Sequence, residues 1–154
     1  MKQDQTILAR KNLDRRLGFL RDEPLIAPPS GWIKAIREAL GLTTRQLAAR
    51  MGVVPSRVTA IEKAEITGAT TIKTLRETAE AMNCTFVYAI VPTDSLDAIL
   101  RNQAIKKADS ELARYHHTMR LENQALTKDD LATERERLVA NMLAGSPRRV
   151  WDDE

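Results

Sequence analysis

Hydrophobic residues recur at steps of three and four along most of the chain, which is the spacing of one face of an α-helix. Leu13, Leu17 and Leu20 share such a face within residues 3–22. A proline-rich stretch follows, and it cannot continue a helix. We therefore expect residues 1–30 to form an amphipathic helix and an extended linker.

Residues 31–83 hold the densest helical pattern and predict four short helices. Gly41 is placed to end the first of them, because glycine readily takes the backbone conformation that closes a helix. Thr43 and Gln46 stand three residues apart, the spacing of a capping box at the start of the second helix.

The tripeptide Gly52-Val53-Val54 separates the second helix from the third. Pro55 suits the first turn of a helix, so the third helix is expected at about residues 55–65, and the fourth at about 71–82. Two helices joined by a turn of three or four residues form a helix-turn-helix unit. Gly52 fits the left-handed conformation needed to leave the second helix.

The period changes at residues 85–91, where β-branched, aromatic and small residues follow one another without polar alternation. This pattern predicts one short β-strand that is covered on both faces, ended by Pro92. A single strand leaves its backbone groups unpaired, and the sequence contains no second good strand. Pairing with the same strand of another copy is the simplest solution, so we expect a homodimer.

Residues 95–124 predict one long helix, and Thr127 with Asp130 marks the start of a last helix that Gly145 ends. The region 93–154 holds ten basic and twelve acidic residues, whereas the rest of the chain holds fourteen basic and nine acidic ones. This asymmetry suggests different partners for different parts of the chain.

The chain is thus expected to have three parts. Residues 1–30 form the N-terminal helix and linker, residues 31–92 form a helix-turn-helix domain with the strand at 85–91, and residues 93–154 form a C-terminal helical region. The fold class is mainly α, with one short strand and extra helices at both ends.

Composition narrows the possible functions. The chain has one cysteine, Cys84, which excludes an internal disulfide framework. One cysteine and two histidines, His116 and His117, are too few for a zinc site built from several such ligands. No apolar run approaches the roughly 20 residues of a membrane span, and the first residues lack the apolar core of a signal peptide. We expect a cytoplasmic protein without metal or cofactor, and, with no catalytic motif visible, not an enzyme.

The outward face of the third helix carries the candidate chemistry. It combines small polar side chains with two long cations: Ser56, Arg57, Thr59, Ala60 and Lys63. Short side chains let a helix approach the major groove of double-stranded DNA, and arginine pairs bidentately with guanine. The alternative is a solvated helix face with no ligand.

The string from Ile36 to Ala48, followed by Gly52-Val53, Val58 and Ile61-Glu62, resembles the Cro/Xre family of DNA-binding domains. With Pro28 to Ile33 and Val87 to Pro92 added, residues 1–92 resemble more narrowly the group called mobile mystery protein A. The first resemblance implies a λ-repressor-like helical bundle. The second implies a Fic-domain protein as a neighbour.

The Cro/Xre resemblance implies DNA contacts at the start of the second helix and along the third. Thr44 stands where the family usually has a glutamine, and Val54 replaces the usual capping serine or threonine. The DNA-binding residues expected from the face and the resemblance together are Thr44, Arg45, Pro55, Ser56, Arg57, Thr59, Ala60 and Lys63.

Two functions follow from these expectations. The first is a sequence-specific transcriptional regulator, a repressor that reads a palindromic operator through the helix at 55–65. The second is an antitoxin-like module that restrains a Fic-domain partner and also represses its own operon. Arg10, Arg15 and Arg16 are either a basic arm toward DNA or the solvated side of a docked helix.

Overall fold

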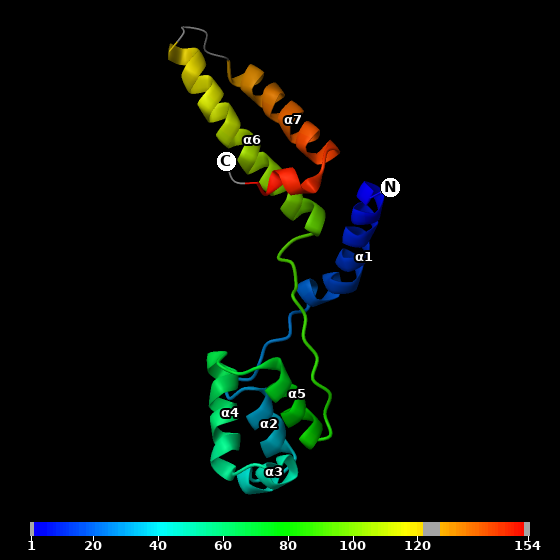
Figure 1. Ribbon diagram of the computed structural model, residues 1–154, viewed down its shortest axis with the longest axis vertical. Coiled ribbons are helices and arrows are strands. Elements are labelled where there is room, and N and C mark those ends of the chain that lie inside the picture. Colours follow the sequence, from blue (N-terminus) through cyan, green and yellow to red (C-terminus); the bar gives the residue numbers. More distant parts are fainter. Residues whose placement is uncertain (1, 122–126, 153–154) are drawn as a thin grey trace. The chain divides into compact units, whose positions relative to one another are not determined.

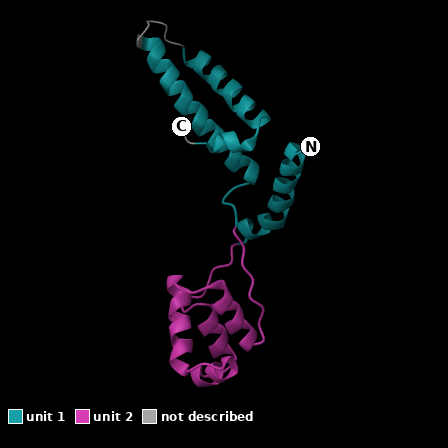
Figure 2. Ribbon diagram, in the orientation of Figure 1, with its two compact units in different colours: residues 1–23, 91–154 teal, residues 24–90 magenta. Residues whose placement is uncertain are grey.

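The computed structural model describes residues 2–121 and 127–152, which are mainly helical, as expected (Figure 1). Its contacts separate into two compact units (Figure 2). Residues 24–90 form one of them, called here the four-helix unit. The segments on either side of it combine into the other, the three-helix unit. Within the described residues, no helix combines the length and apolar character needed to cross a membrane.

The four-helix unit contains α2 (Trp32–Ala39), α3 (Thr44–Met51), α4 (Pro55–Thr67) and α5 (Ile72–Ala81). This unit has one apolar core. The helices α2, α3 and α4 each contribute side chains to it, and the residue after α5 contributes one more. Its buried members are Ile33, Leu47, Ala48, Val58, Ile61 and Met82. Leu47 and Ala48 are neighbours on α3, and Val58 and Ile61 stand three positions apart on α4, so one face of each helix turns toward the core.

Local signals place the ends of α3. The Thr43 hydroxyl accepts a hydrogen bond from the Gln46 backbone N–H at 3.1 Å, and the Gln46 side chain accepts one from the Thr43 N–H at 2.8 Å. This is the expected capping box. Gly52 closes the helix in the left-handed region, with φ 69° and ψ 32°, also as expected.

The three-helix unit contains α1 (Lys2–Asp22), α6 (Leu96–Leu121), α7 (Lys128–Ala144) and a short 3-10 helix, η1 (Pro147–Val150). Residues at steps of four on α6 form a ridge that packs against α7 and η1. The buried members of this core are Leu100, Ala104, Ala108, Val139 and Val150. The end of the predicted helix, residues 122–124, lies outside the described residues.

No residue of α1 is buried. Polar contacts connect this helix to the rest of its unit. Arg10 Nε donates to Asp97 Oδ1 at 2.7 Å, and the Asp14 carboxylate accepts from the Leu96 N–H at 2.9 Å, which caps α6. Gln3 donates to the Ala144 carbonyl oxygen at 2.8 Å. Arg10 therefore serves as an anchor within this unit.

The prediction of a strand at residues 85–91 is wrong: the described residues contain no strand. The segment continues from α5 without regular structure, and Val87 and Ile90 are 76% and 86% exposed rather than covered. β-propensity reflects packing and pairing with a neighbouring strand, and a single copy of this chain supplies no such neighbour.

Candidate nucleic-acid interface

The turn between α3 and α4 sets the geometry of the helix-turn-helix. The N–H of Val53 donates to the Ala48 carbonyl oxygen at 3.0 Å, which satisfies the end of α3 as the chain turns. Val54 occupies the N-cap position of α4 without a side-chain hydrogen bond, and Pro55 begins the helix. The sequence predicted both features, and α4 continues to Thr67, two residues beyond its expected end.

The helix α4 has two different faces. Val58, Ile61 and Glu62 are buried, at the i, i+3 and i+4 spacing of one face. The opposite side is exposed. Its residues are Ser56, Thr59, Ala60 and Lys63. Since successive residues of a helix are about 100° apart, Arg57 lies on the flank of this exposed face, and its side chain is exposed as well.

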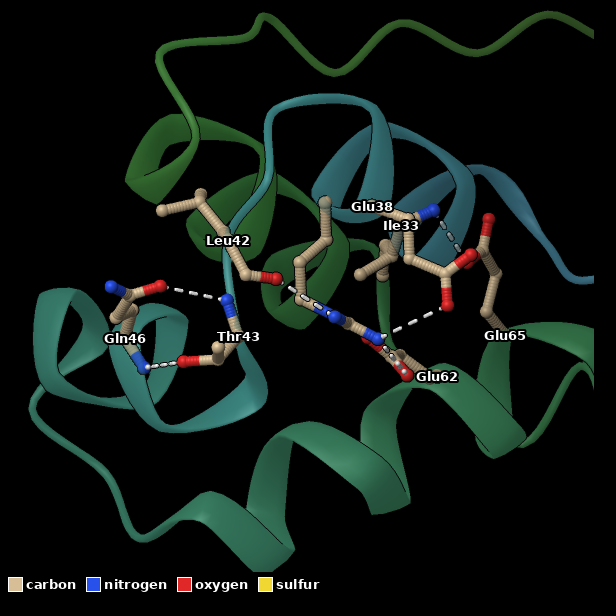
Figure 3. Close-up of polar contacts among 8 residues, drawn as sticks. Ile33, Glu38, Leu42, Thr43, Gln46, Glu62 and Glu65 are labelled. Carbon is tan, nitrogen blue, oxygen red and sulfur yellow. Dashed lines mark hydrogen bonds and ion pairs between the residues drawn. The ribbon is translucent and has the colours of Figure 1, made fainter.

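A buried ion pair attaches α4 to α2. Arg37 and Glu62 are both only 7% exposed, and Arg37 Nε donates to Glu62 Oε1 at 2.5 Å while Nη2 donates to Oε2 at 3.3 Å. Arg37 Nη1 also donates to the Leu42 carbonyl oxygen at 2.9 Å. Figure 3 labels Leu42 and Glu62, which both accept hydrogen bonds from this guanidinium. One guanidinium thus connects α2, α4 and the approach to α3.

Electrostatics favour the charged form of Arg37. The hydrogen bond to Glu62 raises the pKa of the Arg37 guanidinium, and the negative charges of Glu62 and Glu38 raise it further against the opposing effect of burial. A guanidinium is charged throughout the physiological range in any case. Arg37 is therefore charged where its hydrogen bonds link the two helices.

A second carboxylate of α4 caps α2. Glu65 Oε1 accepts from the Trp32 N–H at 2.8 Å. Glu65 Oε2 accepts from the Ile33 N–H at 3.0 Å (Figure 3). Gly31 approaches this carboxylate so closely that an added Cβ would lie 2.7 Å from Glu65 Oε2. Its φ of 81° also favours glycine. The carboxylate complements the positive end of the α2 dipole.

These contacts determine the charge that the helix-turn-helix presents to solvent. Both acidic residues of α4, Glu62 and Glu65, are engaged within the unit, and α3 has no acidic residue. The exposed side of α4 retains Lys63, with Arg57 beside it, and α3 adds Arg45. The exposed side of the two helices therefore has no carboxylate, and its charged side chains are all cations.

The expected contact residues of α3 lie at its N-terminus. Thr44 is the first residue of the helix and is half-buried, and Arg45 follows it and is exposed. The first N–H groups of a helix lack partners from within it, so this end attracts anions such as phosphate. All eight expected residues thus lie in α3 or α4, and seven of them are exposed.

The sequence patterns alone indicate no ion pair or helix cap for Arg37, Glu62 or Glu65. A signal for Glu62 was present, because it stands one residue after Ile61 and four after Val58, on the apolar face of its helix. A carboxylate on a buried face requires a positively charged or donating partner. The sequence does not say which of the eight cations of this region supplies it.

Comparison with known families gives one match. Residues 33–88 match the family model described as Helix-turn-helix, which is of the Cro/C1 type. The match covers the four helices of this unit and a little over a third of the chain. No curated protein and no solved structure matches. The fold and the match together indicate a DNA-binding regulator as the class of protein.

Proposed function

We propose that the chain is a sequence-specific transcriptional repressor that places α4 in the major groove of its operator. The observation that carries the proposal is the division of charge on α4: both carboxylates point inward to Arg37 and to the α2 N-terminus, and small or cationic side chains point outward. A carboxylate on the outward face would repel the phosphates of DNA, whereas this face contains none.

The proposed contacts are divided by side-chain size. Ser56, Thr59 and Ala60 are short, so they let the helix approach the base edges. Arg57 reads a base from the flank of the helix, and Lys63 contacts phosphate. On α3, Thr44 and Arg45 hold the backbone of the same half-site, and Pro55 begins the helix that enters the groove.

A repressor of this kind acts as a homodimer. Two copies related by a two-fold axis present two α4 helices, and these fit half-sites about 34–36 Å apart, or multiples of that distance, in a palindromic operator. Repression follows if such an operator overlaps a promoter, because the bound dimer then competes with polymerase for the same DNA.

The proposal is tested by substitutions on α4. Arg57→Ala is expected to weaken binding to the operator by roughly 1–3 kcal/mol and to relax selectivity at one base pair. Lys63→Ala is expected to weaken binding to operator and random duplex alike, and to reduce the slope of log K against log salt by about 1. Lys73→Ala on α5 is the matched control, since the side chain of Lys73 is 82% exposed and lies outside the proposed contacts.

Fluorescence anisotropy with labelled duplexes measures all three variants. Equal losses for Arg57→Ala and Lys73→Ala would contradict the placement of α4 in the groove. An Arg57→Ala loss that is the same on operator and random DNA would make Arg57 a phosphate contact, and base reading would then have to come from other residues.

A second candidate function concerns the three-helix unit. This unit has its own buried core on α6, α7 and η1, so the four-helix unit does not need it in order to fold. We propose that it restrains a Fic-domain partner, the neighbour implied by the resemblance to the mobile mystery protein A group, while the four-helix unit represses the shared operon. Co-purification of the full chain with the product of the adjacent gene tests this; failure to retain that product contradicts it.

A further inference from the structure

One part of the four-helix unit exposes large apolar side chains that no described contact covers. These residues, called here the apolar surface, are Leu25, Ile26, Trp32, Val87, Tyr88 and Ile90. They come from the two chain segments that enter and leave the unit and from the first residue of α2. Their exposed fractions run from 44% for Trp32 to 86% for Ile90.

A groove brings the two segments together. It has a volume of about 320 Å³ and lies between α2 and α5, with Leu25 on one side and Phe86 and Val87 on the other. Ile36 and Leu75 contribute to its apolar lining. Three residues of the apolar surface, Leu25, Trp32 and Val87, line this groove. The other three, Ile26, Tyr88 and Ile90, stand one to three positions from them along the same two segments.

The area is large for a surface left in water. Side chains of this size each present roughly 150–200 Å² when free, so the five most exposed residues together present on the order of 600 Å². A typical monomer leaves at most about 300–600 Å² in one apolar patch. A stable pair of proteins buries about 800 Å² on each partner, most of which this surface and the rim of its groove supply.

Charge is absent from both segments. Residues 24–33 and 81–93 contain no Asp, Glu, Lys or Arg, although 29% of the whole chain is charged. Depletion of charge is the compositional mark of the centre of an interface. The two segments of identical copies can therefore meet without like charges being brought together. The one carboxylate among the residues that line the groove, Glu65, is engaged at the N-terminus of α2.

Tyr88 contacts an aromatic neighbour on its own segment. Its ring stacks on that of Phe86, with centroids 6.1 Å apart and planes 21° apart, even though Tyr88 is 66% exposed. An ordered aromatic side chain loses little entropy when a partner covers it. Tyr88 is thus suited to anchor an interface.

We infer that the occupant is a second copy of this chain, which meets the apolar surface with its own across a two-fold axis. Val87 and Tyr88 of each copy then lie against the groove of the other, and Ile90 and Ile26 close the edges. This inference rests on the proposed homodimer and assigns its surface. A two-fold axis suits the surface, because each copy offers both the groove and the side chains to fill it.

The test is the oligomeric state of the full chain by sedimentation equilibrium over a range of concentrations. The wild-type chain is expected to be a dimer. Val87→Asp and Ile90→Asp place a carboxylate in the interface, and each is expected to weaken dimerisation at least about tenfold. Both side chains are exposed in the single copy, so circular dichroism is expected to show an unchanged fold.

Leu40→Asp is the matched control. Leu40 is 56% exposed in the same unit, at the end of α2 and outside the apolar surface, so this variant is expected to remain a dimer. A monomeric wild-type chain, or a dimer that survives both Val87→Asp and Ile90→Asp, overturns the inference. Equal disruption by Leu40→Asp also overturns it.

The same samples separate this inference from the proposed function. A monomeric wild-type chain that still prefers operator over random duplex would overturn the dimer surface and leave the DNA contacts of α4 intact. A dimer that Val87→Asp dissociates, but that binds no DNA, would support the surface and overturn the repressor.

Discussion

The buried pair of Arg37 and Glu62 gives the sharpest stability prediction. Glu62→Leu keeps a side chain of similar volume on the inner face of α4. It leaves the Arg37 guanidinium with the Leu42 carbonyl oxygen at 2.9 Å and the exposed Glu38 carboxylate at 3.9 Å. Breaking a buried ion pair from one side costs about 3–5 kcal/mol, since the remaining charge is desolvated without compensation. We expect a loss in that range for this variant.

That loss is large against the stability of the unit. A domain with the length of residues 24–90 has a free energy of unfolding of roughly 3–10 kcal/mol. Glu62→Leu is therefore expected to leave the four-helix unit partly unfolded at 37 °C. The double variant Arg37→Met with Glu62→Leu removes both charges, and it is expected to lie within about 2 kcal/mol of the wild type, with part of that difference from the lost Leu42 hydrogen bond.

Two tryptophans make the assay specific to each unit. Trp32 belongs to the four-helix unit and Trp151 to the other one. In a Trp151→Phe background, urea denaturation followed by tryptophan fluorescence reports the four-helix unit alone. Urea carries no charge, so it does not screen the ion pair.

The exposed pair of Lys73 and Glu77 supplies the control. Their charged atoms are 3.9 Å apart and their side chains are 82% and 58% exposed. Glu77→Leu is expected to change the free energy of unfolding by no more than about 0.5 kcal/mol. The reasoning is refuted if Glu62→Leu costs less than about 1 kcal/mol, or if the double variant is no more stable than Glu62→Leu.

Three further substitutions or conditions test the local geometry. Gly31→Ala is expected to destabilise the four-helix unit by about 1–3 kcal/mol in the same urea assay, because it needs a left-handed alanine and crowds Glu65; an unchanged midpoint would refute this. Val54→Ser supplies the missing N-cap of α4 and is expected to raise the free energy of unfolding by about 1 kcal/mol. Thermal and urea denaturation are both expected to show this increase. Hydrogen bonds from the Thr127 hydroxyl and N–H lower the pKa of Asp130. Its folded-state pKa is thus below the unfolded one, so the α7 cap contributes fully at neutral pH and is lost as the pH falls through the folded pKa. An NMR titration is expected to show this lowered pKa. Thr127→Ala is expected to reduce the shift, because it removes the hydroxyl donor and keeps the backbone N–H.

The parts of the fold that depend on neighbouring residues could be predicted from the sequence. The Thr43–Gln46 capping box and the left-handed Gly52 involve residues no more than a few positions apart, so their patterns are visible in the chain. The exposed side of α4 followed from its helical period for the same reason. The eight expected DNA-contact residues stay a prediction until binding is measured.

The parts that depend on distant residues could not be predicted. Arg37 and Glu62 are 25 positions apart, and nothing in their local sequence names one as the partner of the other. Val150, in a tail that looks polar, is 1% exposed because η1 packs against α6. The strand at residues 85–91 failed similarly: its composition suits a strand, but pairing requires a neighbour that composition cannot supply.

The measurement that tests the central claim most directly is the affinity of the purified chain for the DNA upstream of its own gene, compared with random duplex, across a salt series. The account predicts a preference of roughly a thousandfold or more at physiological salt, with affinity falling as salt rises. Equal affinity for both duplexes at every salt concentration would contradict it, because the exposed face of α4 would then be only a cationic surface.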